Sequence, residues 1–129
     1  MPTSVETVQE FIATFIAAWP QGDAAMLGSF FSGDAVYHNI PMEPVHGRGA
    51  ILATLAEFMD MGGQVGVDII HMVADGPIVM TERVDHFIGA ETTISLPLMG
   101  IIEVHDGVIT VWRDYFDLSQ FTAQTPDGD

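Results

Sequence analysis

Two acidic residues and one arginine occupy strand positions where charged side chains are unusual. Side chains two residues apart on a strand share a face, so Arg83 and Asp85 lie on one face with Val79, Thr81 and Phe87. On the last strand, Asp114 shares a face with Val108, Thr110, Trp112 and Phe116. A buried carboxylate costs several kcal/mol unless it is paired, and one guanidinium can donate to two carboxylates. Two buried acids and one arginine therefore form a sensible set, in which the arginine binds both carboxylates.

The same spacing is compatible with an outer sheet face. Arg83 with Asp85, and Arg113 with Asp114, could equally form solvated ion pairs, which are common on surfaces and contribute little. Periodicity alone does not decide which face of the sheet is inside.

A second polar pair lies in Val36-Tyr37-His38-Asn39. Tyr37 and Asn39 share a strand face and offer a hydroxyl and an amide, which together can hold a water molecule. Both residue types are also ordinary at a strand end that leads into a proline loop, so the spacing alone favours this structural interpretation.

Other chemistries lack their motifs. The histidines are His38, His46, His71, His86 and His105, and none follows a metal-ligand spacing. Gly47-Arg48-Gly49 is too short for a phosphate loop, a Gly-x-Ser-x-Gly motif is missing, and without cysteine there is no thiol nucleophile. We therefore expect neither a metal nor a cofactor. The eight methionines are more typical of core filler or of an apolar pocket lining.

The elements that position these residues follow from periodicity and turn signals. Thr3-Ser4-Val5-Glu6 predicts a capping box, and apolar residues at helical spacing follow it as far as Trp19. We expect Asp23 to cap a short helix through Phe30, Ser32-Gly33-Asp34 to form a turn, and a further helix over 50–61. Strands are expected over 35–40, 65–74, 78–88, 92–105 and 108–116, with a hairpin at Asp106-Gly107.

Helices followed by antiparallel strands indicate an α+β fold, with N-terminal helices packed on one face of a curved sheet. The length of 129 residues predicts a single domain over 1–129, with a flexible tail over 122–129. Pro97 within a strand predicts an edge position or a bulge.

Charge and composition exclude several classes of function. The net charge is −15, from 18 acidic and 3 basic residues, and lysine is absent. Such a chain repels phosphates and anionic lipids, so we expect no nucleic-acid and no membrane partner. There is no apolar run of 18 residues, and the N-terminus lacks the features of a signal peptide. These features predict a cytoplasmic protein.

Taken together, three motifs resemble the limonene-1,2-epoxide hydrolase family, and the resemblance covers nearly the whole chain. The motifs are Tyr37-His38-Asn39-Ile40-Pro41-Met42, Thr81-Glu82-Arg83-Val84-Asp85 and Gly107-x-Ile109-Thr110-x-Trp112-Arg113-Asp114-Tyr115-Phe116-Asp117. The resemblance implies the fold of nuclear transport factor 2, shared with ketosteroid isomerase and SnoaL-like polyketide cyclases. In that fold the helices and a strongly curved mixed or antiparallel sheet enclose a cone-shaped pocket.

The resemblance also implies roles. Asp114 would be the general base and would hold the attacking water with Tyr37 and Asn39. Asp85 would be the general acid, and Arg83 would bridge the two carboxylates. The implied pocket suits a small apolar epoxide and is lined by Ile16, Trp19, Val67, Phe87, Leu96, Leu98 and Phe116. The product is a trans-diol, no cofactor is needed, and the family leads us to expect a homodimer.

Two other functions fit the same fold. An isomerase or cyclase would use an aspartate base with hydrogen-bond donors, but Arg83 next to Asp85 works against keeping that acid neutral by desolvation alone. A non-catalytic pocket that binds a ligand is the second alternative. It would be favoured if Arg83, Asp85 and Asp114 faced bulk water.

Overall fold

The computed structural model describes residues 1–125, and its first helix begins as the sequence predicts. Helix α1 (Ser4–Ala18) starts at a capping box: Glu6 N donates to Thr3 Oγ1 at 3.1 Å, and Thr3 N donates to Glu6 Oε1 at 2.9 Å. These reciprocal bonds satisfy backbone donors that an isolated helix end leaves unpaired. The capping-box prediction is confirmed.

The segment after α1 differs from the prediction in two places. It contains two 3₁₀ helices, η1 (Trp19–Gln21) and η2 (Ala24–Phe30), and the side chain of Asp23 makes no capping hydrogen bond to η2. The predicted Asp23 cap is therefore wrong. The predicted turn at 32–34 is also wrong, because these residues belong to strand β1 (Phe31–Asn39). The register of β1 against β6 shifts between Phe31 and Val36, so turn-prone residues here accommodate an irregularity within a strand.

The remaining elements follow the predicted order. They are β2 (Val45–His46), α2 (Arg48–Met59), β3 (Gln64–Asp75), β4 (Ile78–Ile88), β5 (Thr93–His105), β6 (Val108–Tyr115) and α3 (Leu118–Thr122). Strand β4 has the predicted bounds, whereas α2 begins and ends two residues earlier than predicted. Strand β2 and helix α3 were not predicted. Asp106 and Gly107 both have positive φ, 52° and 80°, as a two-residue hairpin turn requires.

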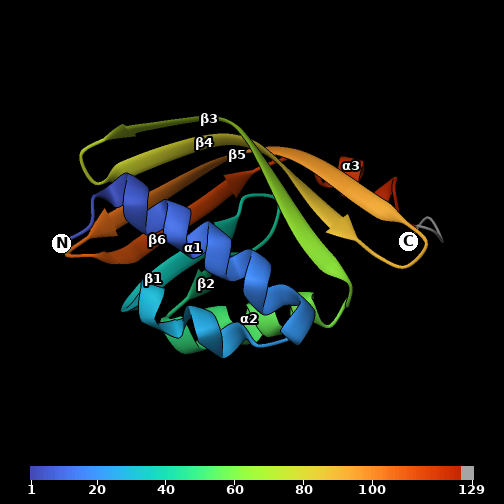
Figure 1. The fold of residues 1–129 in the computed structure, drawn as a ribbon, viewed down its shortest axis with the longest axis horizontal. Helices are drawn as coiled ribbons and strands as arrows, with labels where there is room; N and C mark the ends of the chain where they lie inside the picture. The colour runs from blue at the N-terminus through green and yellow to red at the C-terminus, as the bar shows by residue number, and fades with distance from the viewer. Residues whose placement is uncertain (126–129) are drawn as a thin grey trace.

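The strands form one open, mixed sheet in the order β2-β1-β6-β5-β4-β3. All neighbours are antiparallel except β1 and β6, which are parallel. Figure 1 shows the long strands curving over α1, with α2 beneath β1 and β2. The predicted α+β class, with helices on one face of a curved sheet, is confirmed.

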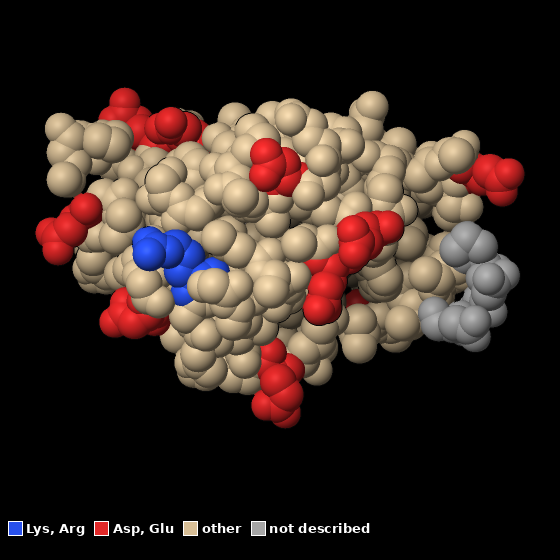
Figure 2. Space-filling view, turned by 90° about the horizontal axis from the view of Figure 1, so that it is seen from below, with Lys and Arg blue, Asp and Glu red and all other residues tan. Residues whose placement is uncertain are grey.

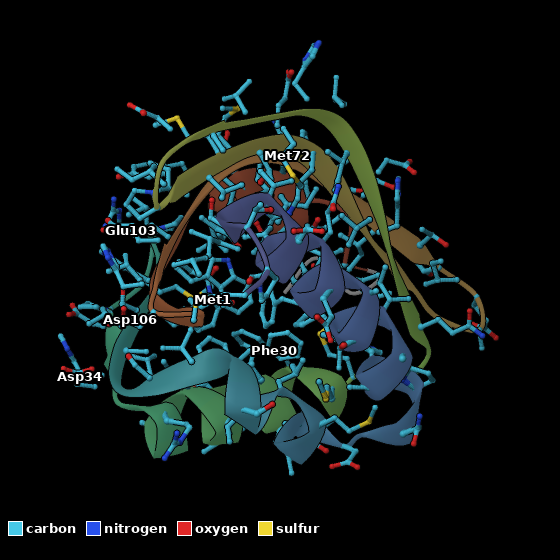
Figure 3. All side chains as sticks on the ribbon, turned by 60° about the vertical axis from the view of Figure 1, so that its left-hand side comes forward. Met1, Phe30, Asp34, Met72, Glu103 and Asp106 are labelled. Atoms are coloured by element: carbon cyan, nitrogen blue, oxygen red, sulfur yellow. The ribbon has the colours of Figure 1, made fainter. Side chains whose placement is uncertain are left out.

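The core lies between α1 and the concave face of the sheet. Phe11 of α1 is at its centre, with its ring 5.1 Å from that of Trp112 and 5.5 Å from that of Phe31, both edge-on. Figure 3 shows side chains filling the space under the arch of the sheet, where Phe30 and Met72 point inward while Asp34 and Glu103 point away. A polar group on the concave face is therefore shielded from solvent, and it needs a polar partner on the same face.

The negative charge is spread over the surface. Figure 2 shows red side chains scattered over one face of the molecule and only a small blue patch. One of the three arginines, Arg83, is only 6% exposed, so two arginines, Arg48 and Arg113, remain to offset the acidic side chains of the surface. Over residues 1–125, no helix has both the length and the apolar character needed to cross a bilayer.

Residues 122–125 lie against the sheet. Thr122 ends α3, and the side chain of Gln124 hydrogen-bonds to the backbone of Ser95 in β5. The rest of the predicted flexible tail, 126–129, lies outside the described residues. Pro97 lies in β5 two residues before Met99, which pairs with Tyr115 at the end of β6. Within residues 1–125, no strand therefore pairs with Pro97 on that side. The predicted edge environment of Pro97 is thus confirmed.

Candidate active site

Arg83 joins two carboxylates on the concave face of the sheet. Its Nε donates to Asp85 Oδ1 at 2.9 Å, and its Nη2 donates to Asp114 Oδ2 at 2.8 Å and to Asp85 Oδ2 at 3.3 Å. The side chains of Arg83 and Asp114 are each 6% exposed, and that of Asp85 is 15% exposed. The face that periodicity left open is therefore the inner one, and the interpretation as solvated ion pairs is wrong for these three residues.

Thr81 completes the arginine's hydrogen bonds. It lies two residues before Arg83 on β4, and its Oγ1 accepts from Arg83 Nη1 at 2.9 Å. Thr81 is 1% exposed. With all three nitrogens of the guanidinium engaged, Arg83 is fixed in one orientation, and so are the two carboxylates that it binds.

A row of paired residues crosses the sheet at this point. Asn39 of β1 pairs with Asp114 of β6, Asp114 with Gly100 of β5, and Gly100 with Thr81 of β4. A Cβ atom at Gly100 would lie 2.6 Å from Asp114 Oδ1 and would overlap Arg83 Nη1. The site therefore occupies the volume that any other residue at position 100 would fill.

Tyr37 and Asn39 lie next to Asp114 at the other end of this row. Asn39 Nδ2 donates to Tyr37 Oη at 2.9 Å. The ring of Tyr37 stacks on that of Trp112, with centroids 4.0 Å apart and planes at 21°. The parallel pairing of β1 with β6 thus brings together a hydroxyl, an amide and a carboxylate from two segments far apart in the sequence.

One oxygen of Asp114 is free of protein partners. Asp114 Oδ2 accepts from Arg83 Nη2, whereas Oδ1 is buried and has no hydrogen-bond partner within residues 1–125. A buried carboxylate oxygen without a partner is costly. This oxygen can accept a hydrogen bond from a bound water or substrate hydroxyl, and Tyr37 and Asn39 lie beside it.

Burial changes the protonation of the site. It raises the pKa of Asp85, and the nearby Arg83, which acts in the opposite direction, offsets this only in part. Burial also raises the pKa of Tyr37, and the charge of Asp114 raises it further. For Arg83, burial lowers the pKa, but the charges of Asp114 and Asp85 outweigh burial and raise it. Asp85 therefore retains a proton more readily than an ordinary aspartic acid, while Arg83 stays charged and Tyr37 stays neutral.

These polar groups line a cavity of about 340 Å³ whose walls are mostly apolar. This volume lies in the lower part of the range of about 300–1,000 Å³ typical of small-molecule sites. Six of the seven predicted lining residues contribute to it: Trp19, Val67, Phe87, Leu96, Leu98 and Phe116. Ile16 does not line the cavity. It is 36% exposed, because α1 turns its neighbour Phe15 towards the cavity instead.

Two of the groups that sequence reasoning missed around the cavity position the site. Thr81 and Gly100 support the charged cluster, and a glycine inside a strand was the available signal for the close approach at position 100. Leu118, Phe121 and Thr122 line the cavity from α3. The signal for α3 was Asp117, which caps it by accepting from Ser119 N at 3.0 Å.

The histidines take no part in the cavity lining. His86, for example, contacts Ser95 Oγ and Asp68 Oδ2 from β4, at 2.7 and 2.8 Å. Over residues 1–125, the structure contains no group of three or more His, Cys, Asp or Glu side chains that could hold a metal ion.

The curved, open, mixed sheet packs over the helices and lines a mostly apolar cavity that contains the charged cluster. This arrangement defines a protein of the nuclear transport factor 2 and SnoaL-like fold. Residues 3–127 match the family model of the limonene-1,2-epoxide hydrolase catalytic domain. The chain belongs to this family. It is 37% identical over 109 residues to the epoxide hydrolase EphG of Mycobacterium tuberculosis (strain ATCC 25618 / H37Rv), covering 83% of this chain and 71% of that protein.

Solved structures agree with this assignment. The structure of an M. tuberculosis LEH-like epoxide hydrolase is 31% identical, with a TM-score of 0.71, and the match covers 92% of this chain and 89% of that one. A SnoaL-like polyketide cyclase from Shewanella denitrificans OS-217 is 19% identical, with a TM-score of 0.77 and coverage of 92% and 96%. The second similarity concerns the fold alone.

Proposed function

We propose that this protein is an epoxide hydrolase that adds water to a small apolar epoxide in one step. The observation that carries the proposal is the shared guanidinium: Arg83 binds two buried carboxylates, and one of them keeps an oxygen that makes no hydrogen bond to any residue of 1–125. Epoxide opening needs a nucleophile at carbon and a proton at the departing oxygen. Two carboxylates with different protonation states supply both.

Asp114 acts as the general base. Its free Oδ1 accepts a proton from a water molecule that Tyr37 and Asn39 help to hold. The hydrogen bond from Asn39 Nδ2 to Tyr37 Oη leaves the hydroxyl proton of Tyr37 and the amide oxygen of Asn39 for that water. The water is thereby aimed and activated at the same time.

Asp85 acts as the general acid. Burial raises its pKa, so it retains the proton that the epoxide oxygen takes as the carbon–oxygen bond breaks. Arg83 holds both carboxylates in place and balances the negative charge that remains on the pair. After turnover, Asp114 carries one proton more than at rest and Asp85 carries one proton fewer. A transfer of one proton from Asp114 to Asp85 through solvent therefore restores the site.

The cavity selects the substrate class. Apart from Thr122, its polar side chains are those of the charged cluster with Tyr37 and Asn39, and the rest of the lining is mostly aliphatic and aromatic. This arrangement suits an uncharged cyclic or terpenoid epoxide such as cyclohexene oxide or limonene oxide. Water attacks the carbon from the side opposite the departing oxygen, so a cyclic epoxide gives a trans-diol.

Product analysis tests the proposal. The protein is incubated with cyclohexene oxide and with limonene oxide, and the products are separated by chiral gas chromatography, with the Asp114→Asn variant as the matched control. We expect trans-diol from the wild type and only the uncatalysed background from the variant. Binding of both epoxides without diol would instead favour a non-catalytic ligand pocket. Rearranged, unhydrated products would favour an isomerase.

We further propose that the protein forms a homodimer through the outer face of the sheet. Large apolar side chains are exposed on this face, among them Val73 of β3, Met80 of β4, Met99 of β5 and Tyr115 of β6. Large apolar side chains exposed on one face are typical of an association site, and a second copy of the chain is the occupant that the family leads us to expect. Sedimentation equilibrium should give twice the monomer mass, and Val73→Glu together with Met99→Glu should reduce it to the monomer value.

A further inference from the structure

Strand β5 has an edge that β6 does not cover. The last pair between them joins Met99 to Tyr115, so the first part of β5, residues 93–98, extends past the end of β6. On its other side β5 pairs with β4 along this whole stretch. The backbone groups that point away from β4 here need a partner of another kind.

The side chain of Gln124 supplies that partner at Ser95. Ser95 N donates to Gln124 Oε1 at 2.9 Å, and Gln124 Nε2 donates to Ser95 O at 2.9 Å. A primary amide has the donor and acceptor of a peptide group, so Gln124 takes the place of a residue on a neighbouring strand. Its Nε2 also donates to Gln120 O of α3, at 2.6 Å.

This contact fixes α3 against the sheet at the cavity. Three residues of α3 line the cavity, namely Leu118, Phe121 and Thr122. The ring of Phe121 meets that of Phe87 edge-on, with centroids 5.7 Å apart. Helix α3 has only five residues, too few to be stable by itself. It is attached to the end of β6 at one side, and the amide of Gln124 holds it at the other. Figure 1 shows α3 next to β5, beyond the end of β6.

We propose that Gln124 is a positioning residue that determines the fit of the substrate: by pairing with the free edge of β5 at Ser95, it holds α3 as a wall of the cavity. Only the kinetic part of this inference rests on the proposed function. Gln124 does not line the cavity, so it acts through Phe121 and Leu118. Without it, a smaller share of molecules has the wall in place, and apparent substrate affinity falls by that share.

Amide hydrogen exchange tests the structural part without any activity. In the wild type, the Ser95 amide should be protected by Gln124 Oε1. In Gln124→Ala its exchange should accelerate at least about tenfold. The amide of Leu96, which faces β4, is the internal control and should not change. If the Ser95 amide exchanges at the same rate in both proteins, Gln124 does not hold this edge and the proposal is wrong.

Steady-state kinetics tests the functional part. With cyclohexene oxide, Gln124→Ala should raise KM about three- to tenfold while kcat stays within about twofold. Gln124→Glu has nearly the same size but lacks the amide donor, so it should raise KM as well. Gln120→Ala is the matched control, because it removes the same group from an exposed position of α3, and it should leave KM unchanged. A fall in kcat at constant KM would assign Gln124 to the chemical step and overturn the proposal.

A ligand without an epoxide separates this inference from the proposed function. Cyclohexanol binding is followed by tryptophan fluorescence, since Trp19 and Trp112 both line the cavity. We expect its Kd to rise by the same factor as KM in Gln124→Ala and in Gln124→Glu. If the wild type hydrolyses neither epoxide but this shift in Kd is found, the proposed function fails and the role of Gln124 stands. An unchanged Kd in both variants overturns the role of Gln124.

Discussion

Gly100 and Asp114 face each other across the β5–β6 pair, and the missing side chain of one makes room for the carboxylate of the other. A Cβ at position 100 would stand 2.6 Å from Asp114 Oδ1 and 3.0 Å from Thr81 Oγ1. The free oxygen of Asp114 and the hydroxyl that supports Arg83 therefore converge on one backbone position. The charged cluster can be buried inside a sheet only because this strand has no side chain there.

Replacing Gly100 by alanine should disrupt the cluster. The added methyl must displace Arg83 or Asp114, so we expect a loss of about 1–3 kcal/mol in the free energy of unfolding. A displacement of about 1 Å of a catalytic group can lower turnover about a hundredfold, and we expect at least that loss in kcat. Urea unfolding and diol formation measure the two effects.

Gly66→Ala is the matched control for this change. Gly66 also lies in a strand, β3, but its Cβ would meet neighbours only at 3.8 Å or beyond, which is ordinary contact. This variant should retain the activity of the wild type. Equal losses of activity in both variants would show that any alanine in place of a strand glycine lowers activity, whether or not it lies beside Asp114.

Thr81→Val should weaken the site through Arg83. The change keeps the shape but removes the oxygen that accepts from Arg83 Nη1. A buried charged donor without a partner costs about 1–3 kcal/mol, so unfolding in urea should occur at lower concentration. Because Arg83 then orients Asp85 and Asp114 less firmly, we also expect kcat to fall about tenfold. Thr81→Ser retains the hydroxyl and should behave like the wild type in both measurements.

The sequence predicts most of the fold because its local signals agree with the tertiary structure. Strand β4 has the predicted bounds, and the Thr3–Glu6 box and the Asp106-Gly107 turn form as expected. The failures occur where tertiary structure overrides a local preference. Residues 32–34 are typical of a turn, yet they continue β1, because pairing with β6 on either side of the irregularity stabilises the extended chain.

The candidate site was only partly predictable for a similar reason. Shared faces bring Arg83 and Asp85 together from one strand, since both residues obey a period of two. The distance between Asp85 and Asp114 depends instead on which strands are neighbours, and periodicity contains no information about strand order. Ile16 illustrates the limit on a helix: it differs from the lining residue Phe15 by one position, and only the packing of α1 decides which of the two faces the cavity.

The pH dependence should reflect the raised pKa of Asp85, which burial causes. Activity requires a proton on the acid and none on the base, so kcat/KM should be bell-shaped, and its limbs belong to the coupled pair of carboxylates. The alkaline limb appears where the pair loses its last proton, which the general acid needs to donate. A rate that rises with pH and stays constant into the alkaline range would remove Asp85 from the mechanism.

Stability should also depend on pH through Asp85. A raised pKa in the folded state means that the native protein still holds a proton at pH values where the unfolded chain has released it. The native state then binds more protons, and the free energy of unfolding falls as pH rises from the ordinary aspartate pKa through the raised one. Urea unfolding over this range should show that fall. In Asp85→Asn, which cannot titrate, the fall should be smaller.

Asp114→Asn should abolish hydrolysis and leave the fold intact. The two side chains have nearly the same shape, and the amide oxygen can still accept from Arg83 Nη2, but the amide cannot take a proton from water. General-base catalysis contributes about 10²- to 10⁴-fold, so we expect kcat to fall by about that factor, while the urea midpoint shows that the protein remains folded. An active Asn variant would show that Asp114 is not the base.

A single turnover in ¹⁸O-water distinguishes water attack from covalent catalysis by Asp114. An aspartate nucleophile would form an ester with the opened epoxide, and water would later cleave that ester at its carbonyl carbon. The first diol would then carry an unlabelled oxygen from the carboxylate. Direct attack places the label in the diol at once. We expect labelled diol, because Tyr37 and Asn39 lie beside the free Oδ1 of Asp114 and their polar groups suit a water held between that oxygen and the substrate. With enzyme in excess over cyclohexene oxide, mass spectrometry of the diol gives the answer, and an unlabelled product would make Asp114 the nucleophile.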